Sequence, residues 1–198
     1  MNTFRFLRAF FFVFCLTLQH PSVAQQNAAP RAICQVYFSP RGAATSAIIE
    51  NLEDAKSTIL VQAYSFTSLP IAEALVRAHE RGVEVQVLLD KSQRTQGYTA
   101  ASLLAKAAIP TSIDAAHAIA HNKVIIIDNE TVFTGSFNFT KAAEERNAEN
   151  LLVIHDDQLA ARYIENWRFH HAHSVPFSRM TKDNQHLSSP AMRPRSRD

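Results

Sequence analysis

Few residues in this sequence could cross-link the chain, and few could form a nucleotide-binding loop. Its two cysteines are Cys15 and Cys34, and we expect the first to be removed with an amino-terminal segment. A chain that keeps Cys34 alone forms no intrachain disulfide, and we interpret this residue as a small buried hydrophobe. The four glycines form no glycine-rich phosphate loop, and the sequence contains neither a metalloprotease motif nor an internal repeat.

The apolar run at residues 9–18 is too short to span a bilayer. Arg5 and Arg8 precede this run, and a short segment ending in small residues at Ala24 follows it. A basic region, an apolar region and a small-residue cleavage site, in that order, are typical of a secretory signal peptide. We therefore predict a signal peptide over residues 1–24, a polar linker over 25–33, and an exported protein, periplasmic or secreted.

The sequence has no large excess of charge of either sign. Its 20 basic and 18 acidic residues give a formal net charge of +2. Removal of residues 1–24 takes away two arginines and no acid, which leaves 18 basic residues against 18 acidic residues. Nucleic-acid-binding proteins are often basic, so this balance weighs mildly against such a partner but leaves room for a local basic patch.

Strand patterns alternate with helical patterns along most of the chain. We expect strands at 34–38, 58–64, 83–89, 123–127, 131–134 and 150–154, and helices at 40–55, 70–81, 98–108, 140–146 and 158–171. This alternation predicts an α/β fold, a layered α/β/α sandwich around a mixed, largely parallel central sheet. The runs "KVIII" and "NLLVI" indicate strands buried on both faces. The domain should occupy residues 34–177, and the polar residues 178–198 should form a disordered tail.

Four polar residues stand out at the ends of two of these strands. His121 and Lys123 share one face of a strand because side chains alternate, and Ser136 and Asn138 share a face for the same reason. A hairpin with a two-residue loop at positions 129–130 would place Lys123 opposite Ser136 and His121 opposite Asn138. We therefore expect all four side chains to cluster at one end of an otherwise apolar hairpin.

Such a cluster suits a phosphoryl group, whose negative charge grows during the reaction. A neutral imidazole is a competent nucleophile and proton carrier, and the neighbouring Lys123 supplies positive charge. Glu149 follows on a strand that could lie beside the hairpin, so it is a candidate to orient His121. Asp128 lies about 23 Å from that histidine along an extended strand and has the opposite parity. We interpret Asp128 as a residue that stabilises the turn.

The spacing of these residues resembles a known signature. His121-x-Lys123, four residues, Asp128, six residues and then Gly135-Ser136 match the H-x-K-x4-D-x6-G-S motif of the phospholipase D superfamily. The likeness continues through Asn138 into "NAENLLVI" and extends from about Val36 to Trp167. It is greatest to the short, exported, single-motif bacterial endonucleases of the Nuc type.

This resemblance implies a mechanism with a phosphohistidine intermediate and no metal ion or other cofactor. It assigns His121 as the nucleophile, while Lys123 and Asn138 hold phosphate oxygens with support from Ser136. Glu149 would orient the imidazole, and Asp128 would have a structural role. The other histidines lack a lysine two residues on, so the second histidine that the family uses as a general acid must come from another chain. A homodimer with the site at its two-fold interface would bring two copies of His121 together.

The same chemistry serves several substrates. A non-specific endonuclease that acts on DNA, and possibly on RNA, is the first interpretation, and a lipid phosphodiesterase acting on membrane lipid is the alternative. A non-catalytic binding module is a third, disfavoured because His121, Lys123 and Asn138 are all present. An apolar rim beside the site would favour lipid, and a basic groove would favour nucleic acid.

Two further groups of residues have a simple and a functional interpretation. His170-His171-x-His173 could bind a metal ion, but we interpret it as a polar helix end. The second group could contact a nucleic-acid backbone or could be ordinary solvated charges, and it consists of Lys91, Arg94, Lys141 and Arg146.

Overall fold

The computed structural model describes residues 33–177. The chain divides into two units, Met1–Arg31 and Ala32–Asp198, and the described residues belong to the second. The predicted signal peptide, nearly all of the predicted linker and the predicted polar tail lie outside the described residues. None of the helices within residues 33–177 has both the length and the apolar character needed to cross a membrane.

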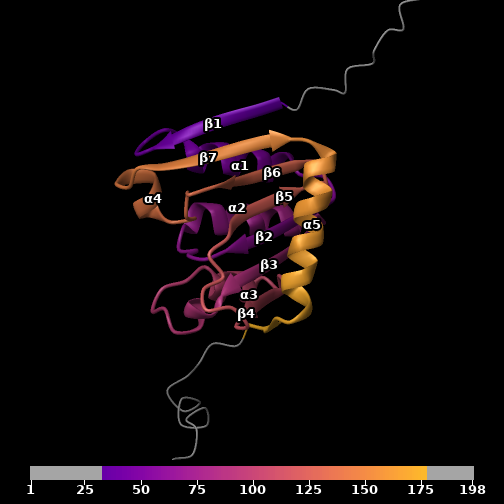
Figure 1. Cartoon of the computed structure of the whole chain (residues 1–198). Coiled ribbons are helices and arrows are strands. Elements are labelled where there is room, and N and C mark those ends of the chain that lie inside the picture. Colours follow the sequence, from indigo (N-terminus) through magenta and orange to yellow (C-terminus); the bar gives the residue numbers. More distant parts are fainter. Residues whose placement is uncertain (1–32, 178–198) are drawn as a thin grey trace, which may run out of the picture. The chain divides into compact units, whose positions relative to one another are not determined.

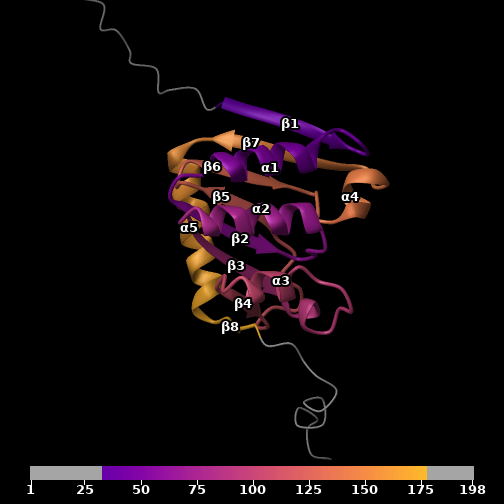
Figure 2. The same ribbon diagram turned by 180° about the vertical axis from the view of Figure 1, so that it is seen from behind.

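The described residues form one eight-stranded sheet with helices on both faces (Figures 1 and 2). The strand order across the sheet is β1-β7-β6-β5-β2-β3-β4-β8. The strands are β1 (Ile33–Ser39), β2 (Thr58–Ala63), β3 (Glu84–Asp90), β4 (Thr111–Asp114), β5 (Lys123–Ile127), β6 (Thr131–Gly135), β7 (Glu149–His155) and β8 (Val175–Pro176). The helices are α1 (Ala44–Asp54), α2 (Leu69–Glu80), the 3-10 turn η1 (Lys91–Arg94), α3 (Ala101–Lys106), α4 (Lys141–Glu145) and α5 (Asp157–Ala172).

The predicted α/β sandwich and mixed sheet are confirmed, but the expectation of a largely parallel sheet is wrong. Of the seven strand pairings among residues 33–177, only β2 with β3 and β3 with β4 are parallel. Helical crossovers make those two pairs parallel, because α2 and α3 return the chain to the same edge. The later strands β5, β6 and β7 follow one another without long helices, so they form an antiparallel meander.

Two apolar layers hold the helices to the sheet. Helices α1, α2 and α3 bury Ile48, Leu75 and Leu104 against one face. Helix α5 crosses the opposite face, where Ile164 and Trp167 pack with residues of β3, β5 and β6 (Figure 1). The Trp167 indole nitrogen also donates a hydrogen bond to a β2 carbonyl at 3.0 Å. Burying one such large apolar side chain stabilises the fold by about 1.5–3 kcal/mol. Both layers therefore hold in place the strands whose ends carry the polar side chains.

Several local predictions need correction. Helix α1 begins at Ala44 rather than at Pro40, because Arg41 and Ala43 adopt positive φ angles of 61° and 63°. The short strands β4 and β8 were not expected. All five β5 residues are buried, as predicted for "KVIII", but β7 buries only alternate residues. Cys34 is exposed rather than buried, because it lies on the edge strand β1.

Candidate active site

The polar residues of the predicted cluster line one open pocket at one end of the strands. Strand β5 begins at this end, β6 ends there and β7 begins there. The pocket has a volume of ≈ 630 Å³. It is lined by His121, Lys123, Gly135, Ser136, Asn138, Glu149 and Asn150. The five side chains assigned to catalysis therefore come together although they span 29 positions of the sequence.

The hairpin that brings them together is offset by one residue from the predicted register. Ile127 pairs with Thr131 and Ile125 with Phe133, so continuing the ladder sets Lys123 opposite Gly135 rather than Ser136. The prediction of a two-residue loop was wrong because the turn contains three residues, with positive φ angles of 53° at Asp128 and 59° at Asn129. The predicted pairing of His121 with Asn138 also fails, since β5 starts only at Lys123 and β6 ends at Gly135.

A bulge at the end of β6 turns Ser136 and Asn138 into the pocket despite this offset. The backbone N–H groups of Ser136 and Phe137 both donate to the Asn150 carbonyl, each at 3.1 Å. Two residues facing one partner are the mark of a β-bulge, which re-aims the following side chains. Gly135 makes the bulge possible, because its φ is 152° and an added Cβ would collide with the Asn150 carbonyl oxygen.

His121 lies just before β5 and is held by its neighbours' backbone and rings. The Lys123 ammonium donates to the His121 carbonyl at 2.7 Å, and the Tyr64 amide donates to the Asn122 carbonyl at 2.8 Å. The Tyr64 ring lies 4.6 Å from the exposed imidazole and 5.2 Å from the ammonium, measured to ring centroids. The imidazole is therefore exposed to solvent, while hydrogen bonds hold the backbone that carries it in place.

The Lys123 ammonium is buried at the bottom of this arrangement. Only 6% of Lys123 is exposed, and burial lowers the pKa of its ammonium while the nearby Glu149 carboxylate opposes that shift. Lysine has three N–H donors, and one is used on the His121 carbonyl. An anion that enters the pocket can therefore receive the others in surroundings where charge is weakly screened.

The remaining polar groups differ in how they are engaged. The Ser136 hydroxyl accepts hydrogen bonds from the Asn150 backbone N–H at 3.0 Å and from its side-chain amide at 3.4 Å. The Asn138 amide oxygen is buried and accepts no hydrogen bond from residues 33–177. This oxygen can only accept a hydrogen bond, so a bound molecule would have to offer it a donor, whereas the Asn138 amide N–H groups are the ones that can donate to a phosphate oxygen.

Glu149 lines the pocket but does not hold the histidine ring. Its carboxylate accepts a hydrogen bond from the Asn147 side chain at 3.1 Å. Within residues 33–177, no hydrogen bond joins it to His121. In this structure its action on the site is electrostatic and falls on Lys123.

Asp128 stands at the opposite end of the hairpin and ties two strands together. Its carboxylate accepts hydrogen bonds from the backbone N–H groups of Lys56, Ser57 and Thr58 at 2.8, 2.7 and 3.0 Å, and from the Ser57 hydroxyl at 2.8 Å. Burial alone would raise the pKa of Asp128, but these hydrogen bonds lower it below its ordinary value. The motif aspartate thus anchors the β5–β6 turn to the start of β2.

Sequence reasoning missed Tyr64 and Asn150. Tyr64 follows β2, and only the antiparallel pairing of Ala63 with Lys123 shows that it contacts the imidazole. Asn150 lay within "NAENLLVI", but its contact with Ser136 depends on the bulge. The basic residues Lys91, Arg94, Lys141 and Arg146 are not among those lining the pocket.

Comparison with known protein families agrees with this geometry. The family model described as "Cardiolipin synthase, PLD-like domain" matches residues 48–170, which contain every residue that lines the pocket. The chain belongs to the phospholipase D superfamily. It is a phosphodiesterase of that superfamily, and four residues of its sequence motif, His121, Lys123, Gly135 and Ser136, line the pocket.

Relatives of this superfamily member carry different names. A protein named phospholipase D from Rickettsia typhi is 41% identical over 170 residues, which cover 86% of this chain and 78% of that protein. A human protein named mitochondrial cardiolipin hydrolase is 30% identical over 129 residues, covering 65% of this chain and 51% of that protein. Among solved structures, Nuc from Salmonella typhimurium, described as a phospholipase D family member, is 40% identical with a TM-score of 0.72. The matched region covers 74% of this chain and 99% of Nuc.

Proposed function

We propose that this phosphodiesterase is a non-specific endonuclease that cleaves nucleic-acid phosphodiester bonds through a phosphohistidine intermediate. The observation that carries this proposal is the lining of the pocket, which contains an imidazole, a buried ammonium, two amides, a hydroxyl and a carboxylate, and no apolar side chain. Such a pocket can hold a phosphate and its sugar neighbours without reading a base, so cleavage should depend little on sequence. The similarity to Nuc supports the same substrate class.

The proposed reaction has two displacements at phosphorus. An imidazole nitrogen of His121 attacks, a P–N bond forms, and the bond to the leaving oxygen breaks as that oxygen takes a proton from a general acid. Water then attacks the phosphohistidine, gives its proton to the same group, and releases the free imidazole. Lys123 and Asn138 stabilise the charge on the phosphate oxygens throughout.

The general acid is proposed to be His121 of a second copy. None of the other six histidines within residues 33–177 lines the pocket, and the imidazole of His121 is exposed at its mouth. A homodimer that closes over the pocket would place two such rings on either side of one phosphate. Each ring would then take the role of nucleophile or acid according to how the substrate lies.

A lipid substrate is the second candidate, and apolar residues near the pocket favour it. Phe38 is 65% exposed on β1 and pairs with Asn150, which lines the pocket. Ile119 is 58% exposed and lies two residues before His121. A lipid phosphodiesterase would rest this apolar rim on the membrane, and a dimer would cover it with the second copy.

One substrate panel separates these functions. Purified protein in EDTA is offered double-stranded DNA, single-stranded DNA, RNA and phospholipid vesicles, with His121→Ala as the inactive variant and His79→Ala as the matched control. We expect cleavage of nucleic acid by wild type and His79→Ala only. Hydrolysis of vesicle lipid with all nucleic acids intact would replace the endonuclease by a lipid phosphodiesterase. Activity that needs added magnesium would contradict the phosphohistidine route.

We also propose that the enzyme acts outside the cytoplasm, because residues 1–24 have the pattern of a signal peptide. Fractionation of expressing bacteria, followed by amino-terminal sequencing, tests this. A mature chain that begins after Ala24 in the periplasm or medium supports export, and a full-length cytoplasmic chain contradicts it.

A further inference from the structure

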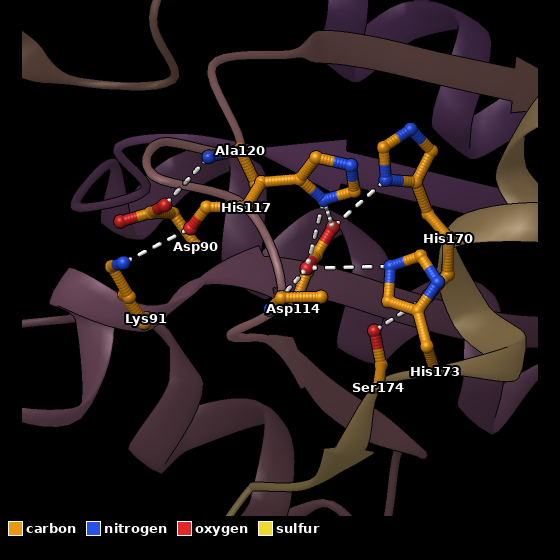
Figure 3. Close-up of polar contacts among 9 residues, drawn as sticks. Asp90, Lys91, Asp114, His117, Ala120, His170, His173 and Ser174 are labelled. Atoms are coloured by element: carbon orange, nitrogen blue, oxygen red, sulfur yellow. Dashed lines mark hydrogen bonds and ion pairs between the residues drawn. The ribbon is translucent and has the colours of Figure 1, made fainter.

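A second polar cluster lies outside the catalytic pocket, at the same end of the strands. Asp114 is the last residue of β4, and His117 follows it in the loop that leads to β5. His170 and His173 come from the carboxyl end of α5, more than fifty positions later. Figure 3 shows the three imidazoles arranged around the Asp114 carboxylate.

The distances in this cluster are short. The Asp114 carboxylate lies 2.9 Å from His117 Nδ1, 2.8 Å from His170 Nδ1 and 3.4 Å from His173 Nε2. One potential ligand atom from each of the four residues can be chosen so that all lie within 4.8 Å of one another. The centroids of the three rings are 4.7–5.6 Å apart.

These four groups match the coordination needs of one ion. Ligand atoms 2.0–2.1 Å from a tetrahedral zinc ion are about 3.3 Å apart, so no pair in the cluster must close by more than about 1.5 Å. Three imidazole nitrogens with one carboxylate oxygen suit zinc, whereas magnesium and calcium take oxygen ligands. We propose that Asp114, His117, His170 and His173 form a Zn²⁺ site distinct from the catalytic pocket.

Supporting contacts hold these residues in place. The Ala116 N–H donates to the Asp114 carboxylate at 3.0 Å, and the Ser174 hydroxyl donates to the His170 carbonyl at 2.7 Å. The Lys91 ammonium donates to the His117 carbonyl at 2.9 Å (Figure 3). Such outer contacts orient metal ligands and raise affinity. Asp114 is fully buried, while the His117 side chain is 41% exposed and leaves a route for the ion.

The site would be structural, because the protein supplies all four ligands of a tetrahedral ion. It joins the end of α5 to β4 and fixes the start of the β4–β5 loop. The other end of that loop is held by the Asp90 carboxylate, which accepts the Ala120 N–H at 2.8 Å. Since His121 comes next, the ion would stiffen the segment that carries the proposed nucleophile.

Zinc binding is tested with untagged, chelator-treated protein in a His121→Ala background, so that the catalytic imidazole adds no signal. Titration against a chromophoric chelator should show one equivalent of Zn²⁺ bound. Zinc at about 100 times its dissociation constant should raise the melting temperature by roughly 5–10 °C, and magnesium should not. Intense visible absorption of the Co²⁺ form should report tetrahedral geometry.

Single substitutions decide whether these residues are the ligands. His170→Ala and His117→Ala should each weaken zinc binding by more than about 100-fold, the upper range for losing a mere supporting contact. His171→Ala is the matched control, because this exposed neighbour on the same helix should leave binding unchanged. His117 lies on a partly exposed loop, so its variant decides the matter if His170→Ala does not fold.

Two results would overturn the proposal: no zinc bound at micromolar concentration, or unchanged affinity in His117→Ala. Neither bears on the endonuclease, because cleavage is measured in EDTA. There the wild type should melt at a lower temperature and still turn over.

Discussion

Asp128→Ala removes a carboxylate that accepts four hydrogen bonds from three consecutive residues at the start of β2. Hydrogen bonds to charged groups contribute about 1.5–3 kcal/mol each, but not additively. Lys56 and Ser57 are exposed residues, so water can replace the carboxylate at their N–H groups, and Thr58 is half-buried. We therefore expect a loss of about 2–4 kcal/mol, with little change in chemistry because the pocket is at the other end of the hairpin.

That loss should lower the melting temperature by about 4–16 °C in a domain of this size. Its dependence on pH follows from the lowered pKa of Asp128. The ionised carboxylate stabilises the fold above the unfolded pKa of about 3.9, and this contribution disappears as pH falls through the lower folded value. The wild type and Asp128→Ala should therefore differ fully at neutral pH and converge in acid.

Thermal unfolding followed by circular dichroism gives the stability, and initial rates well below each melting temperature give the activity. Asp54→Ala is the control, since this exposed carboxylate at the end of α1 should be replaceable without effect. If Asp128→Ala melts with the wild type and yet is inactive, the aspartate takes part in chemistry and the reasoning from its contacts is refuted.

Three further predictions concern the pocket. Gly135→Ala should lower the stability of the fold by about 1–3 kcal/mol and remove most of the activity, because Gly135 has a φ of 152° and closely approaches Asn150. An active variant of normal stability would show that the bulge is dispensable. The rate of cleavage should fall at an alkaline pH that is still below the usual lysine pKa of about 10.4, because the lowered pKa of Lys123 makes it lose its charge earlier. Lys123→Arg should show no such fall, even if this variant is slower at every pH. A mixed dimer of wild type and His121→Ala, isolated through a tag on one chain, should be nearly inactive, because general acid catalysis contributes about 10²–10⁴-fold; half the wild-type rate would mean two independent sites.

The chemistry of the site was more predictable than its geometry. Residue type and spacing were enough to predict that His121, Lys123, Ser136 and Asn138 line the pocket, because such polar groups at strand ends have few structural uses. The register could not be predicted, because the three-residue turn at Asp128 shifts the β5–β6 pairing by one residue, and a bulge follows Gly135 where β6 meets β7. The expected cluster therefore formed through different contacts.

Long-range packing explains what the sequence did not reveal. The direction of β5 to β7 depends on connections without long helices, and nothing in the apolar runs themselves distinguishes parallel from antiparallel pairing. The histidines at the end of α5 looked like a polar helix end because Asp114 lies in β4, a strand of four residues that the pattern did not show. Only the fold places that carboxylate between His170 and His117.

The stereochemical course at phosphorus tests the phosphohistidine route most directly. A nucleic-acid phosphorothioate of known configuration is cleaved in ¹⁸O-labelled water, and the configuration of the product is determined. Two successive in-line displacements, first by His121 and then by water, predict net retention. Net inversion would mean that water attacks the phosphodiester directly, and His121 could then not be the nucleophile.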